Sequence, residues 1–590
     1  FMLALAALCF AAGGASAQQT DGKSVAPKTY KAYMVSDAHL DTQWNWDVQT
    51  TIREYIPRTL FQNLYLMERF PDYRFSFEGG VVYSWMKEYY PMHYERMKKY
   101  IASGQWHIAG ASWDANDPNM PSAESFFRNI LLGQEFYKKE FGVRSTDIFL
   151  PDCFGFGYTL PTIAAHSGLI GMSTQKLSWR NHDFYDAPYH KKNPFSWGVW
   201  YGIDGSSVIA AFDTGGYNSE LPENVQYNER LMERAAHGYD NTCFRYYAGG
   251  GEGVGDKGNS GTVTTCRRLT KAINDPNAPI EIISATSDDL FKAYLGRKAE
   301  LPSFDGELLM DVHATGCYTS QTAMKYYNRR NEELTGAAER ASVAADWLGA
   351  LAYDQRKLTE IWQRFIWHQF HDDLTGTSIP EAYTWSWNDE LIALRQGGDV
   401  MNSAVGALSY SLDTRVKGTP VVVYNAVTYP VKAVVEAEIP LAAKAKGVAV
   451  YGPDGRRVAA QILSREGDKA VIAFAADVKS VGYAVYDVRP ASPAKSSALK
   501  VNGNTIENGV YKLTLDRNGD IASLVDKRYG RELVEQGKAF RLAIFEGNPS
   551  NEWPAWEVLK EVVDKTPRAV TDNVSVLSLI HISEATRPLY

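Results

Sequence analysis

The sequence has few of the residues that build a disulfide framework or a thiolate metal site. Five cysteines are spread over 590 residues, and no two of them form a C-x-x-C pair. We therefore expect neither a disulfide-stabilised scaffold nor a zinc site made of cysteines. A single bridge, between Cys243 and Cys266, stays open as an alternative if the chain folds in an oxidising compartment.

Clustered positive charge and long apolar runs are also lacking. The formal net charge is −8 and the isoelectric point is near 5.9. No run of Lys and Arg could neutralise a series of phosphates, so nucleic acid is not an expected partner. No stretch is long and apolar enough to predict a transmembrane helix. The sequence also has no fixed-period repeat, which argues against a solenoid.

The first residues have the composition of a secretory signal. Residues 2–14 are apolar and small, and Ala15-Ser16-Ala17 supplies an A-x-A cleavage site. We expect residues 1–17 to be a signal peptide and the mature protein to be exported to a periplasmic or extracellular location. Leu8 precedes Cys9 where lipid attachment needs a small residue, so a lipid anchor is not expected.

We interpret the last residues of the chain as foreign to the natural protein. Leu577 to Glu584 reads LSLIHISE, and its back-translation matches a transposon end used in sequencing libraries. We expect residues 577–590 to be an adapter-derived artefact and the natural chain to continue differently.

Three regions of different pattern lie between these ends, which predicts a multidomain α/β protein. From residue 28 to 305, short apolar runs alternate with helical stretches. This pattern predicts a β/α domain with a parallel sheet. Residues 306–412 have helical spacing and predict a helical bundle. Residues 418–576 combine short alternating segments with turn residues, and predict an incomplete antiparallel β-sandwich.

Two polar clusters directly follow predicted strands. In the first, His39 and Asp41 are two residues apart, so in extended chain they face the same way. An imidazole and a carboxylate form part of a zinc shell, and Trp44 just beyond them suits a wall that faces a sugar. In the second cluster, Asp152 precedes two glycines that permit a sharp turn. Taken alone, Asp152 could be a metal ligand, a nucleophile or a turn residue.

A third cluster ends a predicted helix, where His368 and His371 are three residues apart and are expected to share one helix face. A lone pair of this kind is more often structural than functional.

The fourth cluster is a glycine-rich loop from Gly249 to Gly258. It contains the G-x-G-x-x-G spacing of dinucleotide sites, but no helix is expected to follow directly, so nicotinamide or flavin binding is disfavoured. Glu252 and Asp256 on such a loop are better suited to general acid catalysis.

Together the clusters resemble glycoside hydrolase family 38, the class II α-mannosidases, in its bacterial type. The family's H-x-D-x-x-W element is matched by His39, Asp41 and Trp44. Its P-D-x-F-G element, which carries the nucleophile, is matched by residues 151–155. Its H-D-x-x-x-G-T element is matched by residues 371–377.

The resemblance implies that residues 28–305 are the catalytic domain, with the parallel sheet arranged like a seven-stranded barrel. It implies a retaining, exo-acting α-mannosidase that hydrolyses terminal α-mannosyl residues of glycans through a covalent glycosyl-enzyme. It implies Asp152 as the nucleophile and Asp256 as the acid/base, with carboxyl groups about 5–5.5 Å apart. Glu252 is the alternative acid/base, because the sequence after the glycine loop departs from the family pattern. The implied ligands of one divalent ion, usually zinc, are His39, Asp41, Asp152 and His371. The implied sugar-binding residues are Trp44, Asp117, Lys176 and Asp372.

The expected partner is an α-mannoside or an oligosaccharide of the N-glycan type, and an oligomer is possible. Two alternatives stay open. A metal-dependent polysaccharide deacetylase also uses His and Asp clusters on a β/α scaffold, although it needs two neighbouring His ligands that the first cluster lacks. A glycan-binding homologue that has lost its acid is the second alternative.

Overall fold

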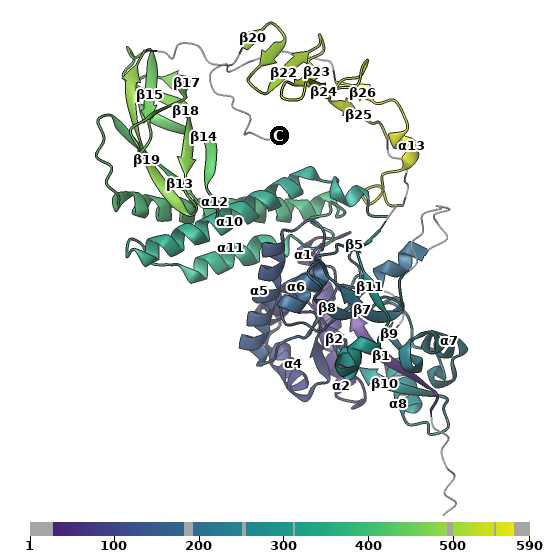
Figure 1. Ribbon diagram of the computed structural model, residues 1–590. Coiled ribbons are helices and arrows are strands. Elements are labelled where there is room, and N and C mark those ends of the chain that lie inside the picture. The colour runs from purple at the N-terminus through teal and green to yellow at the C-terminus, as the bar shows by residue number, and fades with distance from the viewer. Residues whose placement is uncertain are drawn as a thin grey trace, which may run out of the picture.

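The computed structural model describes residues 28–181, 193–249, 255–310, 313–492, 500–547, 550 and 552–570. The predicted signal peptide, Glu252 and the predicted adapter segment lie outside these residues. Figure 1 shows an N-terminal α/β domain, a group of long helices and a β-rich C-terminal region. Within the described ranges, no helix has both the length and the apolar character needed to cross a bilayer.

The first sheet of the N-terminal domain is parallel. Its order is β10 (Ile280–Ala285), β1 (Tyr30–Ala38), β2 (Phe75–Phe77) and β3 (Trp106–Ile108), and β9 (Thr242–Tyr247) also pairs with β1. The last five residues of β1 are all buried, as expected for a parallel strand covered on both faces.

A second sheet lies beside the first, in the order β11 (Ser303–Asp305), β7 (Trp197–Tyr201), β8 (Ser207–Ala211), β6 (Gly171–Ser173) and β4 (Asp147–Phe149). Only β7 and β8 are antiparallel neighbours. A short antiparallel pair joins β5 (Gly155–Phe156) to β12 (Leu308–Leu309). The parallel-sheet prediction is confirmed, and the arrangement like a seven-stranded barrel stays a prediction.

Helices surround both sheets. They are α1 (Val48–Thr50), the π-turn η1 (Thr51–Tyr55), α2 (Ile56–Met67), α3 (Gly80–Tyr89), α4 (Pro91–Ser103), α5 (Ala123–Phe141), α6 (Leu160–His166), α7 (Glu229–His237), α8 (Val263–Ile273) and α9 (Asp289–Tyr294). The helix α5 shows how local sequence sets their ends. Its Ser122 N-cap accepts a hydrogen bond from the Ser125 amide, and Gly142 ends it at a φ of 75°.

Three long helices form the predicted helical bundle: α10 (Thr322–Trp347), α11 (Gln355–Trp367) and α12 (Pro380–Tyr410). Small residues let α10 and α12 approach closely, with Ala341 and Ala345 packing against Ala404. Because α11 ends at Trp367, His368 and His371 do not share a helix face as the sequence predicted. His371 lies in the turn that follows.

The β-rich region is divided more finely than predicted. A small sandwich packs two antiparallel sheets around one core: β13 (Thr419–Asn425), β19 (Gly482–Ala491), β15 (Gly447–Tyr451) and β16 (Arg457–Val458) against β14 (Val431–Pro440), β18 (Lys469–Val478) and β17 (Ala460–Glu466). A separate sheet follows, with strands β20 (Lys500–Asn502), β21 (Thr505–Glu507), β22 (Tyr511–Leu515), β23 (Ile521–Asp526) and β24 (Arg531–Glu532). The sandwich core takes its residues from 421–488, so the predicted single sandwich over 418–576 is two units.

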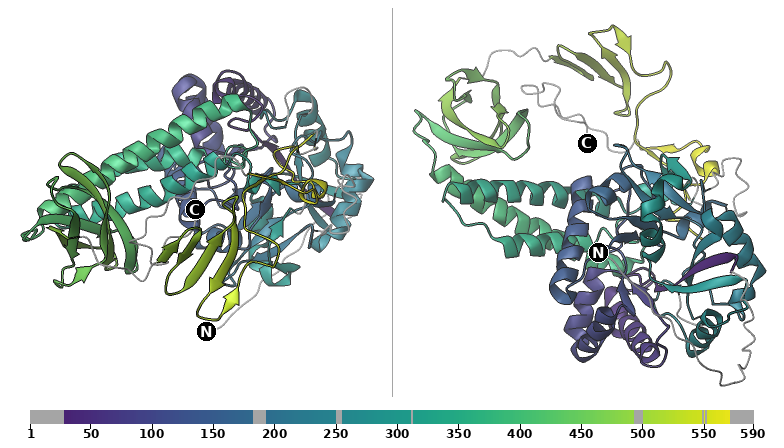
Figure 2. Two further views of the ribbon diagram at one scale, coloured as in Figure 1. Left: turned by 90° about the horizontal axis from the view of Figure 1, so that it is seen from above. Right: turned by 60° about the horizontal axis from the view of Figure 1, so that its bottom comes forward.

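After this second unit the chain returns to the N-terminal domain, as the yellow segment in Figures 1 and 2 shows. It passes through β25 (Ala543–Ile544), α13 (Lys560–Val563) and β26 (Arg568–Ala569). Between β25 and α13, the carbonyl of Trp556 accepts hydrogen bonds from the amides of Ala314 at 3.0 Å and Gly316 at 2.7 Å. Gly316 permits this approach, since a Cβ there would lie 2.6 Å from the carbonyl oxygen of Ala555.

The cysteine bridge left open by the sequence is not formed. The four described cysteines are free and buried. Cys243 packs in a core cluster with Leu231 and Leu269, whereas Cys266 packs in the cluster around β2. Burial raises the pKa of both thiols to about 12, which disfavours the reactive thiolate form.

Candidate active site

The predicted site residues come from the ends of elements that meet on one side of the N-terminal domain. His39 and Asp41 follow β1, Asp152 follows β4, and His371 follows α11. Ligands in parallel α/β folds bind outside the carboxyl ends of the strands. Three of these residues, His39, Asp41 and Asp152, therefore reach the site because β1 and β4 end there.

The glycine-rich loop is fastened to the end of β1. The amide of Asp41 donates to the carbonyl of Asp256 at 2.8 Å, and the amide of Gly258 donates to the carbonyl of His39 at 2.7 Å. Gly258 has a φ of 74°, which favours glycine. This pairing brings Asp256 next to the first cluster.

A buried network of side-chain hydrogen bonds connects the third cluster to the first. The Gln43 amide donates to Asp373 at 2.7 Å, and Asp373 also pairs with His368 Nδ1 at 2.8 Å. Burial lowers the pKa of His368, but hydrogen bonds to Asp373 and Asp389 raise it to about 9. Both ring nitrogens of His368 face carboxylates, of Asp373 and Asp389, so this residue holds the turn that carries His371.

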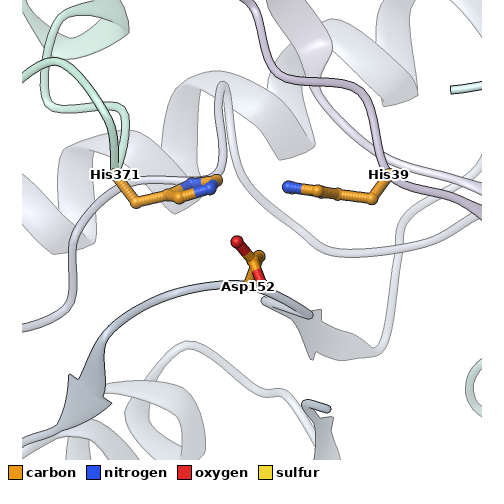
Figure 3. A group of neighbouring side chains, drawn as sticks. All are labelled: His39, Asp152 and His371. Atoms are coloured by element: carbon orange, nitrogen blue, oxygen red, sulfur yellow. The ribbon is translucent and has the colours of Figure 1, made fainter. Parts of the chain in front are cut away.

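The four predicted ligands converge. His39 Nε2 lies 2.9 Å from Asp41 Oδ1, and His371 Nε2 lies 3.4 Å from the same oxygen. One donor atom each from His39, Asp152 and His371 lies within 4.8 Å of the other two. Figure 3 shows the two imidazoles facing each other with the carboxylate of Asp152 between and below them.

The orientation of both imidazoles fits a metal. His39 Nδ1 faces Glu78 Oε1 at 3.2 Å, and His371 Nδ1 faces the carbonyl of Ala115 at 2.9 Å. Acceptors at Nδ1 leave the lone pair on Nε2. Both Nε2 atoms and Asp41 Oδ1 are buried without a hydrogen bond of acceptable geometry within the described ranges. The two imidazole nitrogens lie near the carboxylate of Asp152 and also near that of Asp41, and nitrogen and carboxylate donors of this kind suit a divalent cation.

Glu78 was not identified from the sequence. Glu78 follows β2 as Asp41 follows β1, and the exposed fraction of the whole residue is 6%. Burial raises the pKa of its carboxyl group, and the contact with His39 opposes that rise. Residues 75–78 have the same pattern of a predicted strand followed by a polar residue, and this pattern would have identified Glu78.

Asp152 is held by two neighbours from the turn after β6. Lys176 Nζ lies 3.0 Å from Oδ1 and 3.1 Å from Oδ2, and Gln175 Nε2 donates to Oδ1 at 3.0 Å. The sequence predicted Lys176 as a partner for sugar hydroxyls. The structure places its ammonium against the predicted nucleophile, where it orients the carboxylate and offsets its charge.

Asp256 has the electrostatics of a proton donor. Burial and the nearby charges of Asp41 and Asp152 raise its pKa to about 6. The hydroxyl of Tyr217 donates a short hydrogen bond to Asp256 Oδ1, and the Tyr217 ring lies 5.1 Å from that of His39. Tyr217 was not identified from the sequence, and nothing in its local pattern marks it.

These side chains surround a cavity of about 60 Å³. It is lined by Asp41, Trp44, Asp152, Phe154, Lys176, Tyr217, Asp256, Asp372, Trp553 and Trp556. Three of the four predicted sugar-binding residues are among them. The fourth, Asp117, is not, because its carboxylate accepts hydrogen bonds from the amides of Asn119 and Met120 and caps a turn.

Aromatic rings from distant parts of the chain form one wall of the cavity. The Trp556 ring meets Trp44 edge-on at 6.4 Å and Phe154 at 6.2 Å. Trp553 packs on Trp556 at 5.2 Å. The two tryptophans of the C-terminal segment were not identified from the sequence, because only tertiary folding brings them to residues near the start of the chain.

Comparison with known proteins agrees with this arrangement. The profile of the glycosyl hydrolases family 38 N-terminal domain matches residues 29–307, that of the alpha mannosidase middle domain matches 312–408, and that of the family 38 C-terminal domain matches 506–583.

Two alpha-mannosidases are similar to this chain over most of its length. Alpha-mannosidase G of Dictyostelium discoideum is 29% identical over 570 residues, covering 89% of this chain and 49% of that protein. Alpha-mannosidase 2C1 of Homo sapiens is 27% identical over 566 residues, covering 93% and 49%. The chain thus spans about half the length of these relatives.

The fold is similar to that in a crystal structure of an alpha-mannosidase from Enterococcus faecalis V583. The TM-score is 0.71 at 20% identity, over 92% of this chain and 65% of that one. With three domain profiles in the family's order on one chain, the protein belongs to glycoside hydrolase family 38.

Proposed function

We propose that this chain carries the reaction centre of a metal-dependent, retaining, exo-acting α-mannosidase. The observation that carries the proposal is that two imidazoles lie close to the carboxylates of Asp41 and Asp152, beside a third carboxyl group, of Asp256, with a raised pKa. The names of the relatives support α-mannosides as the substrate class.

The residues that would hold the metal are His39, Asp41, Asp152 and His371. A shell of two nitrogens and two oxygens suits zinc. When bound, the ion would supply Lewis acidity and orient the sugar hydroxyls. Glu78 and the Ala115 carbonyl would keep both imidazoles in the tautomer that binds through Nε2.

The reaction proceeds in two displacements. Asp152 attacks the anomeric carbon and forms a glycosyl ester, while the bond from that carbon to the leaving oxygen breaks. Asp256 gives its proton to that oxygen. Asp256 then takes a proton from water, the water oxygen attacks the anomeric carbon, and Asp152 leaves as a carboxylate. Two inversions retain the configuration.

The small size of the cavity supports exo action. Trp44, Phe154 and Trp556 bound a space of about 60 Å³, far below the 300–1,000 Å³ of ordinary ligand pockets, so a side chain must move to admit one sugar ring. A space that admits one terminal ring favours exo action, whereas an internal residue of a chain would need a groove that is open at both ends.

We also propose export to the periplasm or the cell exterior, on the composition of residues 1–17.

Hydrolysis of an aryl α-mannoside tests the function. Asp152→Asn should lower kcat by roughly 10³-fold or more, with thermal unfolding unchanged. Chelation should abolish activity and added zinc should restore it. Acetate release from an acetylated polysaccharide without mannoside hydrolysis would support a deacetylase instead. Mannoside binding without turnover in the wild type would support a non-catalytic homologue.

A further inference from the structure

A second and larger cavity, of about 710 Å³, lies where the helical bundle meets the sandwich. The C-terminal part of α10 forms one side, and β13 and the start of β19 form the other. Figure 2 shows the sandwich at the end of the long helices farthest from the N-terminal domain. The helix α10 begins at Thr322, beside the C-terminal segment that lines the active site, and ends at Trp347. At 1.5 Å per residue, the 26 residues of α10 span about 39 Å.

Four aromatic rings lie among the aliphatic and charged side chains of this cleft. Trp347, Tyr353, Tyr424 and Tyr483 all line it. Trp347 is 86% exposed and Tyr483 is 45% exposed, so neither ring is part of a protein core. Contiguous exposed apolar side chains of this size mark binding surfaces.

The charged groups of the cleft are held by partners within the protein. Glu339 accepts a bidentate pair from Arg128 at 2.9 and 2.7 Å, and Arg340 Nε donates to the carbonyl of Ala426. The Tyr424 hydroxyl oxygen is shielded from solvent and has no hydrogen-bond partner in the described ranges. The cleft therefore combines ring faces with fixed polar groups and offers no unpaired cluster of cations.

We propose that this cleft is a second carbohydrate site, which binds a neutral oligosaccharide segment far from the bond that is cut. Sugars present apolar C–H faces to rings and hydroxyls to planar polar groups, and the volume lies within the 300–1,000 Å³ of ligand sites. A phosphate-bearing ligand would need unpaired cations. A partner helix would need a continuous apolar stripe, and here the paired charges of Arg128 and Glu339 interrupt it.

The proposal deepens the proposed function, since it makes the substrate a large glycan anchored at two places. Because about 39 Å separates the ends of α10, the cleft acts on polymeric substrates and not on small glycosides. Trp347 and Tyr483 would then be glycan-binding residues that make no contact with the reacting atoms.

The test compares wild type, Trp347→Ala, Tyr483→Ala and the double variant of the full chain. Tyr529→Ala is the matched control, since Tyr529 is 78% exposed and lies outside the cleft. Retardation in native gels that contain mannan, xylan or β-glucan measures binding, and kinetics on mannan and on an aryl α-mannoside measure turnover. Trp347→Ala should weaken binding and raise KM on mannan about tenfold, while its activity on the aryl mannoside stays at the wild-type level. Tyr529→Ala should match the wild type in binding and in both activities.

Equal retardation of wild type and cleft variants, or no retardation by any of the three polysaccharides, would overturn the proposal. So would wild-type dimers in sedimentation velocity that dissociate in Trp347→Ala, because a second copy of the chain would then fill the cleft. An absence of aryl mannosidase activity in the wild type would refute the proposed function alone. In that case, a polysaccharide that retards the wild type but not Trp347→Ala would still support a carbohydrate site in the cleft.

Discussion

Glu78 is predicted to determine the affinity of the site for its metal, although it is not a ligand. Its carboxylate lies 3.2 Å from His39 Nδ1, and the two side chains are 8% and 0% exposed. A buried hydrogen bond to a charged group contributes about 1.5–3 kcal/mol. At about 1.4 kcal/mol per tenfold, Glu78→Ala should weaken zinc binding about 10- to 100-fold. Losses of this size are typical when the partner of a ligating histidine is removed.

The assay is a competition titration of the metal-free protein against a chromophoric chelator. Glu78→Gln should give a smaller loss, because its amide oxygen still accepts from Nδ1–H but carries no charge. Glu54→Ala is the control, since Glu54 is 54% exposed and pairs only with a surface arginine. An unchanged zinc Kd in a folded Glu78→Ala protein would refute the reasoning.

Three further predictions concern turnover of an aryl α-mannoside. Because Asp256 donates its proton in the first step and its pKa is raised to about 6, kcat/KM should fall as pH rises through about 6; a profile with the same alkaline limb in Asp256→Asn would contradict this role. Trp556→Ala removes the ring that packs on Trp44, and at about 0.5–1.5 kcal/mol per aromatic contact kcat/KM should fall about 2- to 12-fold, whereas an unchanged value would show that the C-terminal segment does not contribute to the site. Lys176→Met leaves Asp152 without its ion pair, so kcat should fall by about 10- to 100-fold with little change in KM, and a change confined to KM would instead make Lys176 a sugar-binding residue.

Part of the site could be read from the sequence because it depends on local geometry. His39 and Asp41 lie two residues apart directly after β1, and Asp152 follows β4. Because residues two apart in extended chain point the same way, the common direction of His39 and Asp41 follows from strand periodicity. His371 was placed on a helix, but α11 ends four residues earlier at Trp367. The buried pairing of His368 with Asp373 explains the turn there.

The rest of the site depends on contacts that no local pattern encodes. Tyr217 reaches Asp256 from a loop after β8, and Trp556 reaches Trp44 after two β-rich units have intervened. The division of the β-rich region was missed for a similar reason. Strand periodicity identifies strands, but only packing shows that the core of the sandwich is complete by Val488.

Trapping of the covalent intermediate tests the central claim most directly. The zinc-loaded protein would be treated with a 5-fluoro-mannosyl fluoride, digested, and mapped by mass spectrometry. We predict one fluoromannosyl ester, on the peptide that contains Asp152, and its loss in Asp152→Asn. An ester on another carboxylate, or turnover with no adduct and an inverted product, would contradict the account.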